Sequence, residues 1–140
     1  MNKINVLIAG ATGYIGIALI KILLKHKHVK IKYLCGNTSV GKKISYFDRS
    51  IKNFLPTIVK FKKKYLKEVD VIFTTLPNGG AQLISKNLFR HNKLIDLSGD
   101  FRLKMINNYK IWYKKKHAAP ENIKKSIYSL PELVKEDIKK

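Results

Sequence analysis

The sequence predicts one α/β domain built on a doubly wound parallel sheet. The 140 residues include 45% hydrophobic and 10% aromatic residues, which is enough apolar material to close a single core and excludes a mainly disordered chain. Short branched apolar runs alternate with segments of helical periodicity, and parallel strands require such crossover helices. A glycine-rich turn joins the first apolar run to the first helical segment, and no internal repeat or low-complexity linker divides the chain.

The first unit is a strand, a helix and a second strand. Residues 4–9 are rich in branched apolar residues and end in a glycine turn, as is typical of a buried parallel strand. Residues 14–25 are strongly apolar, with Lys21 and Lys25 four positions apart, which indicates a mostly buried helix with one solvated edge. Residues 29–35 alternate at first and stop before a Gly-Asn pair, which predicts the second strand.

The middle of the chain contains a loop and a further unit of strand and helix. Residues 38–56 are polar and predict a loop with at most one short helix, and residues 57–61 predict a third strand. Residues 69–76 form a clear strand pattern that Pro-Asn-Gly-Gly stops. Residues 81–90 carry apolar side chains at helical spacing, and residues 93–98 predict the next strand.

The last third of the chain predicts two helices, over residues 107–116 and 132–140. His117 lies between them after three lysines, and we expect it on the surface or in a loop. The other three histidines fall at helix ends, where the helix dipole favours an imidazolium, and we expect them to be solvated: His26, His28 and His91.

The charge balance is strongly basic. Twenty-nine Lys and Arg face nine Asp and Glu, which gives a formal net charge of +20 and in isolation would suggest a polyanionic partner. All but three of these cations are lysines, however, and they are spread over nearly every segment. Nucleic-acid binding surfaces usually combine arginine forks with aromatic side chains in one basic groove. We therefore expect no nucleic-acid partner.

The single cysteine and the uncharged N-terminal run bear on the compartment. Cys35 is the only cysteine, which excludes an intramolecular disulfide and a cysteine-rich metal site and predicts a reducing compartment, the cytoplasm. Residues 5–20 carry no charge, but three glycines interrupt them and the run is shorter than the roughly 20 residues of a spanning helix. We predict neither a signal peptide nor a membrane span.

A G-x-x-G-x-x-G run lies between the first strand and the first helix. In a Rossmann-type domain this placement provides a tight turn, close backbone approach to a pyrophosphate, and helix N–H groups that face the phosphates. The sequence therefore predicts dinucleotide binding, with a purely structural tight turn as the alternative. The candidate residues in this run are Gly10, Thr12, Gly13, Tyr14, Ile15 and Gly16.

The end of the second strand indicates which dinucleotide binds. NAD-binding domains usually place an acidic residue there to bind the ribose 2′-hydroxyl, but the first acidic residue in this chain is Asp48. Hydroxyl, amide and ammonium groups suit the extra 2′-phosphate of NADP, which a carboxylate would repel. NADP is favoured over NAD on these grounds. The residues at this position are Asn37, Thr38 and Ser39, followed by Lys42 and Lys43.

Several sequence blocks occur in the order expected of the N-acetyl-gamma-glutamyl-phosphate reductase family, which the chain resembles along its whole length. The Asp-Leu-Ser-Gly-Asp-Phe-Arg and Leu-Pro-Glu-Leu blocks are much more specific than the glycine run, which semialdehyde dehydrogenases share. The blocks that carry the resemblance cover residues 10–16, 38–42, 76–79, 95–102, 112–113, 117–121 and 128–133.

The resemblance implies an activity and further site residues. It implies NADPH-dependent reduction of N-acetyl-gamma-glutamyl phosphate to its semialdehyde, a step of arginine synthesis that proceeds through a cysteine thioester. It also implies a small-molecule substrate held near Ser98 and Arg102, and a homo-oligomer for full-length members. Further cofactor contacts are implied at Leu76, Pro77, Asn78 and Gly79.

The chain departs from the family pattern in three ways. It has Asn78 where the family usually has His, and Asn37 where the family often has an Arg that covers the adenine and 2′-phosphate. The family's nucleophile follows the Leu-Pro-Glu-Leu helix in an Asn-Pro-Gly-Cys block that these 140 residues do not contain. We therefore expect residues 1–140 to be the NADP-binding domain without the catalytic and dimerisation domain, with no catalytic or metal site, and Cys35 to be an inert core thiol.

Alternative functions stay open. The fold would also suit an aspartate-semialdehyde dehydrogenase or an NADP-binding module without catalysis, and the charge alone favours a basic nucleic-acid-binding module. A short-chain dehydrogenase would need a Tyr-x-x-x-Lys pair, and no tyrosine of the chain has lysine four residues on. Arg102 has two interpretations, a clamp on the substrate's phosphate or carboxylate and an ion pair with Asp100 or Glu132.

Overall fold

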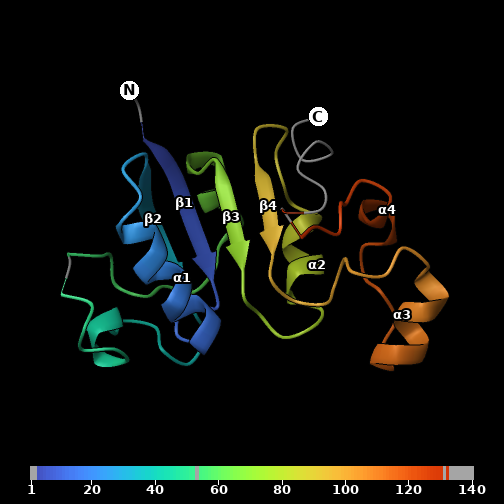
Figure 1. Cartoon of the computed structure of the whole chain (residues 1–140), viewed down its shortest axis with the longest axis horizontal. Coiled ribbons are helices and arrows are strands. Elements are labelled where there is room, and N and C mark those ends of the chain that lie inside the picture. Colours follow the sequence, from blue (N-terminus) through green and yellow to red (C-terminus); the bar gives the residue numbers. More distant parts are fainter. Residues whose placement is uncertain (1–2, 53, 131, 133–140) are drawn as a thin grey trace.

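The computed structural model describes residues 3–52, 54–130 and 132, and its centre is a sheet of four parallel strands (Figure 1). The sequence analysis predicted a strand at each of these four places. The strands lie side by side in the order β2-β1-β3-β4. Their bounds are β1 Ile4–Ala9, β2 Val29–Cys35, β3 Val71–Thr74 and β4 Lys93–Asp96.

Helical segments connect the strands and follow the last one. The helix α1, Tyr14–Leu24, crosses from β1 to β2, and the six-residue α2 crosses from β3 to β4. Figure 1 shows α3 and α4 beyond β4, on the opposite side of the sheet from β2. No helix in the described ranges is long and apolar enough to cross a membrane. The remaining bounds are η1 Ile44–Tyr46, η2 Lys63–Glu68, α2 Gly80–Ser85, α3 Ile106–Tyr113 and α4 Pro120–Ile123.

The centre of the sheet is buried on both faces at β1, with a hydrophobic core on each face, which confirms the doubly wound arrangement. Alternate side chains of β1 enter two different cores, as the pleat of a strand requires. Ile8 packs in a core that includes Ile20 of α1, and Leu7 packs in a core that includes Ile84 of α2. All of these side chains are at most 4% exposed. A strand segment with both faces buried is apolar throughout, which is why Val6, Leu7, Ile8 and Ala9 follow one another without a polar residue.

Three predicted elements differ from the structure. Residues 57–61 form only an isolated parallel bridge between Val59 and Cys35, because pairing stops after the end of β2. The helix predicted at 81–90 ends at Ser85, and a backbone turn in which the N–H of Asn87 donates to Ile84 follows it. The helix predicted at 132–140 lies outside the described residues apart from its first residue.

The burial of α1 also differs from the expectation. The sequence predicts a mostly buried helix, but among its described side chains only Ile20 and Leu23 are buried, together with the backbone of Gly16. Tyr14 is 97% exposed and Ile22 is 64% exposed. One helix packed on a sheet buries only the stripe that faces the strands, and nothing else in the described chain covers its outer face.

Candidate functional site

Four loops follow the carboxyl ends of the strands, and they lie at one edge of the sheet. They contain the residues that the sequence analysis assigned to cofactor and substrate, at 10–16 after β1, 37–39 after β2, 76–79 after β3 and 98–102 after β4. From β1 the chain adds β2 on one side and β3 on the other, which makes the β1–β3 boundary the switch point of the sheet. Ligands of open α/β sheets bind at this edge, next to the switch point.

Hydrogen bonds join the loops after β1, β2 and β3. The carbonyl of Cys35 accepts the N–H groups of Gly10 and Ala11, at 2.9 and 3.2 Å. The hydroxyl of Thr75 donates to the carbonyl of Gly10 at 2.8 Å and lies 3.2 Å from that of Ala9. These bonds fix the glycine-rich turn against both of its neighbours, so its backbone does not depend on a ligand for its shape.

The three glycines of the turn have different structural roles. Gly10 has a φ of +88°, and a Cβ there would lie 2.5 Å from the hydroxyl oxygen of Thr75. A Cβ on Gly16 would collide with the backbone of Gly10 and Ala11. A Cβ on Gly13 would meet only the carbonyl oxygen of Gly10, at an ordinary 3.6 Å. Gly10 and Gly16 are therefore required by the fold itself, whereas the space above Gly13 is open.

The N-terminus of α1 faces this open space. Its N-cap is Gly13, which has no side chain to accept the first N–H groups, and the first turn contains no acidic residue. The first N–H groups of a helix have no partner within the helix, and with the helix dipole they attract an anion. Thr12 is half-buried, and Tyr14 and Ile15 are 97% and 53% exposed beside this end of the helix.

The loop after β2 is pinned to the sheet by its backbone. The N–H of Gly41 donates to the carbonyl of Ile58 at 2.8 Å, and the N–H of Ile58 donates to the carbonyl of Lys42 at 2.9 Å. Asn37 and Thr38 are exposed at the start of this loop. The loop therefore presents the side chains of these two residues to solvent from a fixed backbone.

In the same loop, the hydroxyl of Ser39 is buried and the ammonium of Lys42 is exposed. Ser39 is only 3% exposed, and its hydroxyl is buried beside Gly36 without a hydrogen-bond partner in the described structure. The ammonium of Lys42 is exposed and lies 4.6 Å from the centre of the Tyr46 ring. Lys42 thus packs against the face of the Tyr46 ring, and Ser39 packs in the interior beneath the loop rather than facing solvent.

A buried carboxylate joins the loops after β3 and β4. Asp100 is 0% exposed, and its carboxylate accepts the backbone N–H groups of Gly79 at 2.7 Å and Ala81 at 3.1 Å. It also accepts the side-chain amide of Gln82 at 2.7 Å and the hydroxyl of Tyr109 at 2.9 Å. Asp100 therefore caps α2 and fixes the loop of residues 76–79 through neutral donors alone, which satisfy a buried charge without a cation.

The side chain of His117 belongs to this buried network, which corrects the expectation of a surface histidine. It is 3% exposed, and its Nε2 lies 2.8 Å from the backbone carbonyl of Asp100. Its Nδ1 accepts the N–H of Ala119 at 3.1 Å, so the ring proton is on Nε2 and donates to that carbonyl. The other three histidines are exposed, as predicted.

A second group of hydrogen bonds shapes the loop after β4. Ser98 donates its hydroxyl to the carboxylate of Asp96 at 2.8 Å, and this carboxylate also accepts the hydroxyl of Thr74 at 2.7 Å. The side-chain carbonyl of Asn78 accepts the N–H of Gly99 at 3.3 Å. Asn78 therefore links the loops after β3 and β4, and Ser98 is held in place at the end of its strand.

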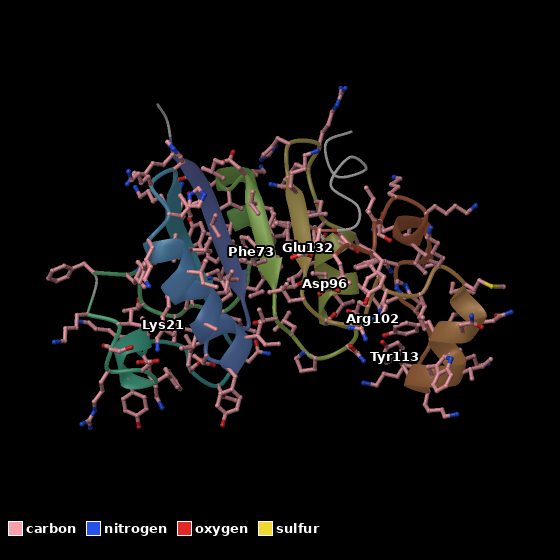
Figure 2. All side chains as sticks on the ribbon, in the orientation of Figure 1. Lys21, Phe73, Asp96, Arg102, Tyr113 and Glu132 are labelled. Carbon is pink, nitrogen blue, oxygen red and sulfur yellow. The ribbon has the colours of Figure 1, made fainter. Side chains whose placement is uncertain are left out.

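Arg102 forms neither of the ion pairs considered from the sequence. The acceptors of Asp100 are occupied by the neutral donors described above, and within the described residues no ion pair joins Arg102 to Glu132. The guanidinium is exposed and lies 5.7 Å from the centre of the Tyr128 ring. Figure 2 places Arg102 beyond the carboxyl end of β4, so its charge is available at the ligand edge.

The sequence analysis missed the residues that hold these loops together. Thr75 was counted only as part of a strand, and Gln82 and Tyr109 only as helix residues. Gln82 is 1% exposed and Tyr109 is 0% exposed, although both side chains carry polar groups. Their partners lie 18 and 9 positions away in the sequence, so no local pattern indicates the contacts.

Cys35 is the inert core thiol that the sequence analysis expected. Its side chain is 2% exposed at the carboxyl end of β2. Burial raises the pKa of this thiol to about 12, so the thiol is protonated at neutral pH. The single cysteine therefore has neither the access nor the ionisation of a nucleophile.

Comparison with known proteins agrees with this geometry. Residues 5–140 match the family described as "Semialdehyde dehydrogenase, NAD binding domain". The chain is 43% identical over 141 residues to the N-acetyl-gamma-glutamyl-phosphate reductase of Ehrlichia ruminantium and 42% identical over 139 residues to that of Campylobacter jejuni. These matches cover 99% of this chain but only 40% of each relative, so the chain spans less than half the length of the curated relatives.

Solved structures support the same fold. The aspartate semialdehyde dehydrogenase with NADP from Candida albicans matches 72% of this chain with a TM-score of 0.59 and 24% identity, and 31% of that protein is covered. The aspartate semialdehyde dehydrogenase II from Vibrio cholerae matches 73% of the chain with a TM-score of 0.52 and 18% identity, over 30% of its own length. At these identities the likeness concerns the fold alone.

Proposed function

The chain belongs to the semialdehyde dehydrogenase family through its NAD-binding domain, and from this premise we propose that it is the NADP-binding part of an N-acetyl-gamma-glutamyl-phosphate reductase. The observation that carries the proposal is the edge at which all four predicted site loops meet and are joined by hydrogen bonds. The names of the relatives indicate the substrate that we propose, the acyl phosphate N-acetyl-gamma-glutamyl phosphate. We propose the cytoplasm as the compartment of the protein.

The residues of the edge fit a dinucleotide. The open space over Gly13 admits a pyrophosphate, and the N–H groups at the start of α1 would donate to it. Asn37, Thr38 and the Lys42 ammonium are exposed near the end of β2 and would hold a 2′-phosphate, with Ser39 supporting the loop from below. The reduced cofactor, NADPH, would supply the hydride when it is bound, and the sequence places no carboxylate at the end of β2 to repel its 2′-phosphate.

The loops after β3 and β4 would hold the reacting end. Residues 76–79 are fixed by Asp100 and would line the site of the nicotinamide. Arg102 would bind the substrate through a charge-assisted pair with a phosphate or carboxylate oxygen. Ser98 would bind it by redirecting to the substrate the hydroxyl proton that it donates to Asp96 in this structure. No residue of the chain is assigned to covalent catalysis, because its only cysteine is the buried Cys35.

The activity can be tested with a chimaera. Residues 1–140 would replace the matching part of the Campylobacter jejuni reductase, to which they are 42% identical. We expect the chimaera to reduce N-acetyl-gamma-glutamyl phosphate with NADPH and the 140-residue chain alone to be inactive. The Gly13→Val chimaera should fold and lose activity, and Cys35→Ser should leave activity unchanged.

Two outcomes would contradict the proposal. A folded chimaera that binds NADPH but does not reduce this acyl phosphate would show that the substrate assignment is wrong. Thiol-dependent turnover by the 140-residue chain, abolished by Cys35→Ser, would show that the chain carries its own nucleophile.

A further inference from the structure

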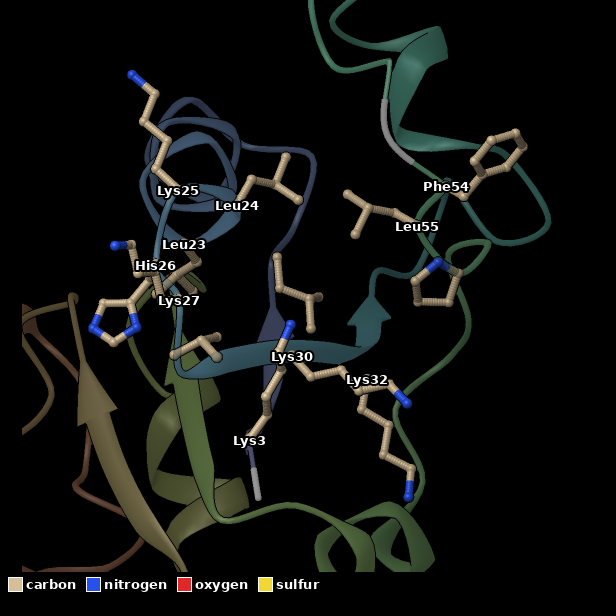
Figure 3. Close-up of a pocket in the computed structure, with 13 residues that line it drawn as sticks. Lys3, Leu23, Leu24, Lys25, His26, Lys27, Lys30, Lys32, Phe54 and Leu55 are labelled. Atoms are coloured by element: carbon tan, nitrogen blue, oxygen red, sulfur yellow. The ribbon is translucent and has the colours of Figure 1, made fainter. Parts of the chain in front are cut away.

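A cavity open to solvent lies at the other end of α1, away from the four loops. Its volume is about 560 Å³, and it is lined by the end of α1, the start of β2 and residues 54–56 (Figure 3). The 11 residues of α1 separate it from the glycine-rich turn by about 16 Å of helix. It is therefore not part of the proposed cofactor site, and the proposed function gives it no role.

The floor of the cavity is apolar. Leu23 and Ile31 are each 8% exposed, and Leu24, Val29 and Leu55 are half-buried around them. Figure 3 shows the side chains of Leu24 and Leu55 facing each other across the cavity. This floor joins the core between α1 and the sheet, so an apolar group placed on it would extend an existing hydrophobic cluster.

The remaining lining is cationic. Within the described part of the chain no acidic side chain lines the cavity, and only Lys32 is neutralised there, by Glu68 at 2.9 Å. Like charges gathered around a partly enclosed apolar surface raise the local positive potential and attract anions. The cationic lining residues are Lys3, Lys25, Lys27, Lys30 and Lys32.

Phe54 lies at the mouth of the cavity, and Figure 3 shows its ring turned away from Leu24 and Leu55. Phe54 is fully exposed to solvent, although it lines the same cavity as Leu55 and Pro56. An aromatic side chain buries a large apolar area when a ligand covers it. The mouth therefore offers a contact surface that the chain itself leaves uncovered.

From these features we propose that the cavity binds a small amphipathic organic anion. Its apolar part would lie on the leucine floor, and its carboxylate or phosphate would face the lysines. The volume of about 560 Å³ falls within the roughly 300–1,000 Å³ of small-molecule sites. Charge complementarity selects an anion and rejects an organic cation of the same size.

The probe for this proposal is octanoate, followed by amide NMR shifts of the 140-residue chain. We expect saturable shifts at residues 23–32 and 54–56, and none with octylammonium at the same concentration. The variant Lys27→Glu/Lys30→Glu should bind octanoate about tenfold more weakly, because two attractive charges become repulsive. Lys115→Glu/Lys116→Glu makes the same change in net charge at exposed residues after α3 and should leave the affinity unchanged.

A second variant tests the apolar contact. Leu55→Ala keeps every lysine and should still weaken octanoate binding, since it removes a half-buried apolar side chain from the floor of the cavity. Equal losses in both lysine variants, or octylammonium binding as tightly as octanoate, would overturn the proposal. So would octanoate shifts centred on residues 10–16, which would assign the anion to the glycine-rich turn instead.

Discussion

At the scale of single residues, the glycine-rich turn separates folding from binding. Gly13 and Gly16 have the same side chain and belong to the same motif, but a Cβ has room at Gly13 and collides with backbone at Gly16. A motif match therefore contains positions that the chain needs for itself and positions that it leaves open for a ligand.

The pair Gly13→Val and Gly16→Ala tests this separation. Gly13 has extended backbone angles that valine adopts, so this variant should lose dinucleotide binding at a cost in stability of about 1 kcal/mol or less. Gly16→Ala should lower the free energy of unfolding by about 2–3 kcal/mol, because the backbone must shift. Urea unfolding and calorimetric titration measure the two effects. A Gly13→Val protein that still binds NADPH normally would contradict the assignment of the open space.

Asp100 provides a second test at this scale. Asp100→Asn replaces one acceptor oxygen by an amide that faces N–H donors, and we expect a loss of about 2–4 kcal/mol in unfolding free energy. Tyr109→Phe removes a single hydroxyl and should cost about 1 kcal/mol. Urea unfolding compares the two variants. Equal costs would mean that Asp100 does not organise the network.

At the scale of elements, an ion pair joins α1 to the loop that contains η1. The ammonium nitrogen of Lys21 lies 2.6 Å from Oδ2 of Asp48. The Asp48 carboxylate also accepts hydrogen bonds from the N–H and the hydroxyl of Ser50. The Lys21 and Ser50 hydrogen bonds lower the pKa of Asp48 from 3.8 to about 2. A carboxyl with a lowered pKa stabilises the fold above its unfolded pKa and loses this effect as the pH falls through the folded value.

This ion pair predicts a pH dependence. By carbon NMR the Asp48 carboxyl should titrate near pH 2 in the parent chain, and Lys21→Met should raise its pKa toward 3.8. The stability difference between the parent and Lys21→Met should be constant above about pH 5 and should disappear between about pH 4 and pH 2. An Asp48 pKa that does not change in the variant would show that Lys21 is not the main cause.

The end of α3 predicts a stabilising substitution. Its C-cap, Lys114, has a φ of +54°, the only positive φ among the described non-glycine residues. Lys114→Gly should raise the free energy of unfolding by about 0.5–1 kcal/mol, because glycine adopts this conformation without strain. The control Lys115→Gly has no such strain to relieve and should not stabilise the chain. Thermal unfolding of both variants checks the difference, and a stabilised Lys115→Gly would contradict the explanation.

The elements show what the sequence could predict. Strands β1 and β2 have the bounds that their patterns predicted, because β1 is rich in apolar residues that pack in cores on both faces of the sheet and β2 alternates before it stops at Gly36. Residues 57–61 have a similar pattern but form one bridge, since strand pairing depends on a neighbour that the local sequence does not specify. The exposed face of α1 was missed for the same reason.

At the scale of the whole molecule, the positions of the site loops could be predicted and their connections could not. Topology requires that loops after parallel strands share an edge, so the glycine-rich turn and residues 37–39 could be placed there from the strand pattern, and residues 76–79 and Ser98 from the family resemblance. The bonds made by Thr75, Asp100 and Gln82 join residues up to 66 positions apart, and the buried setting of His117 follows from them. Only the folded chain shows these contacts.

The central claim is that this edge binds NADP in preference to NAD, and calorimetric titration of the 140-residue chain with NADPH and NADH tests it most directly. Both titrations should be repeated at about 0.5 M salt, because a chain of net charge +20 retains any nucleotide non-specifically at low salt. We predict that NADPH binds about tenfold more tightly than NADH at the higher salt. The reason is that only NADPH has a 2′-phosphate, which would contact Asn37, Thr38 and Lys42 after β2. Equal affinities, or tighter binding of NADH, would contradict the claim.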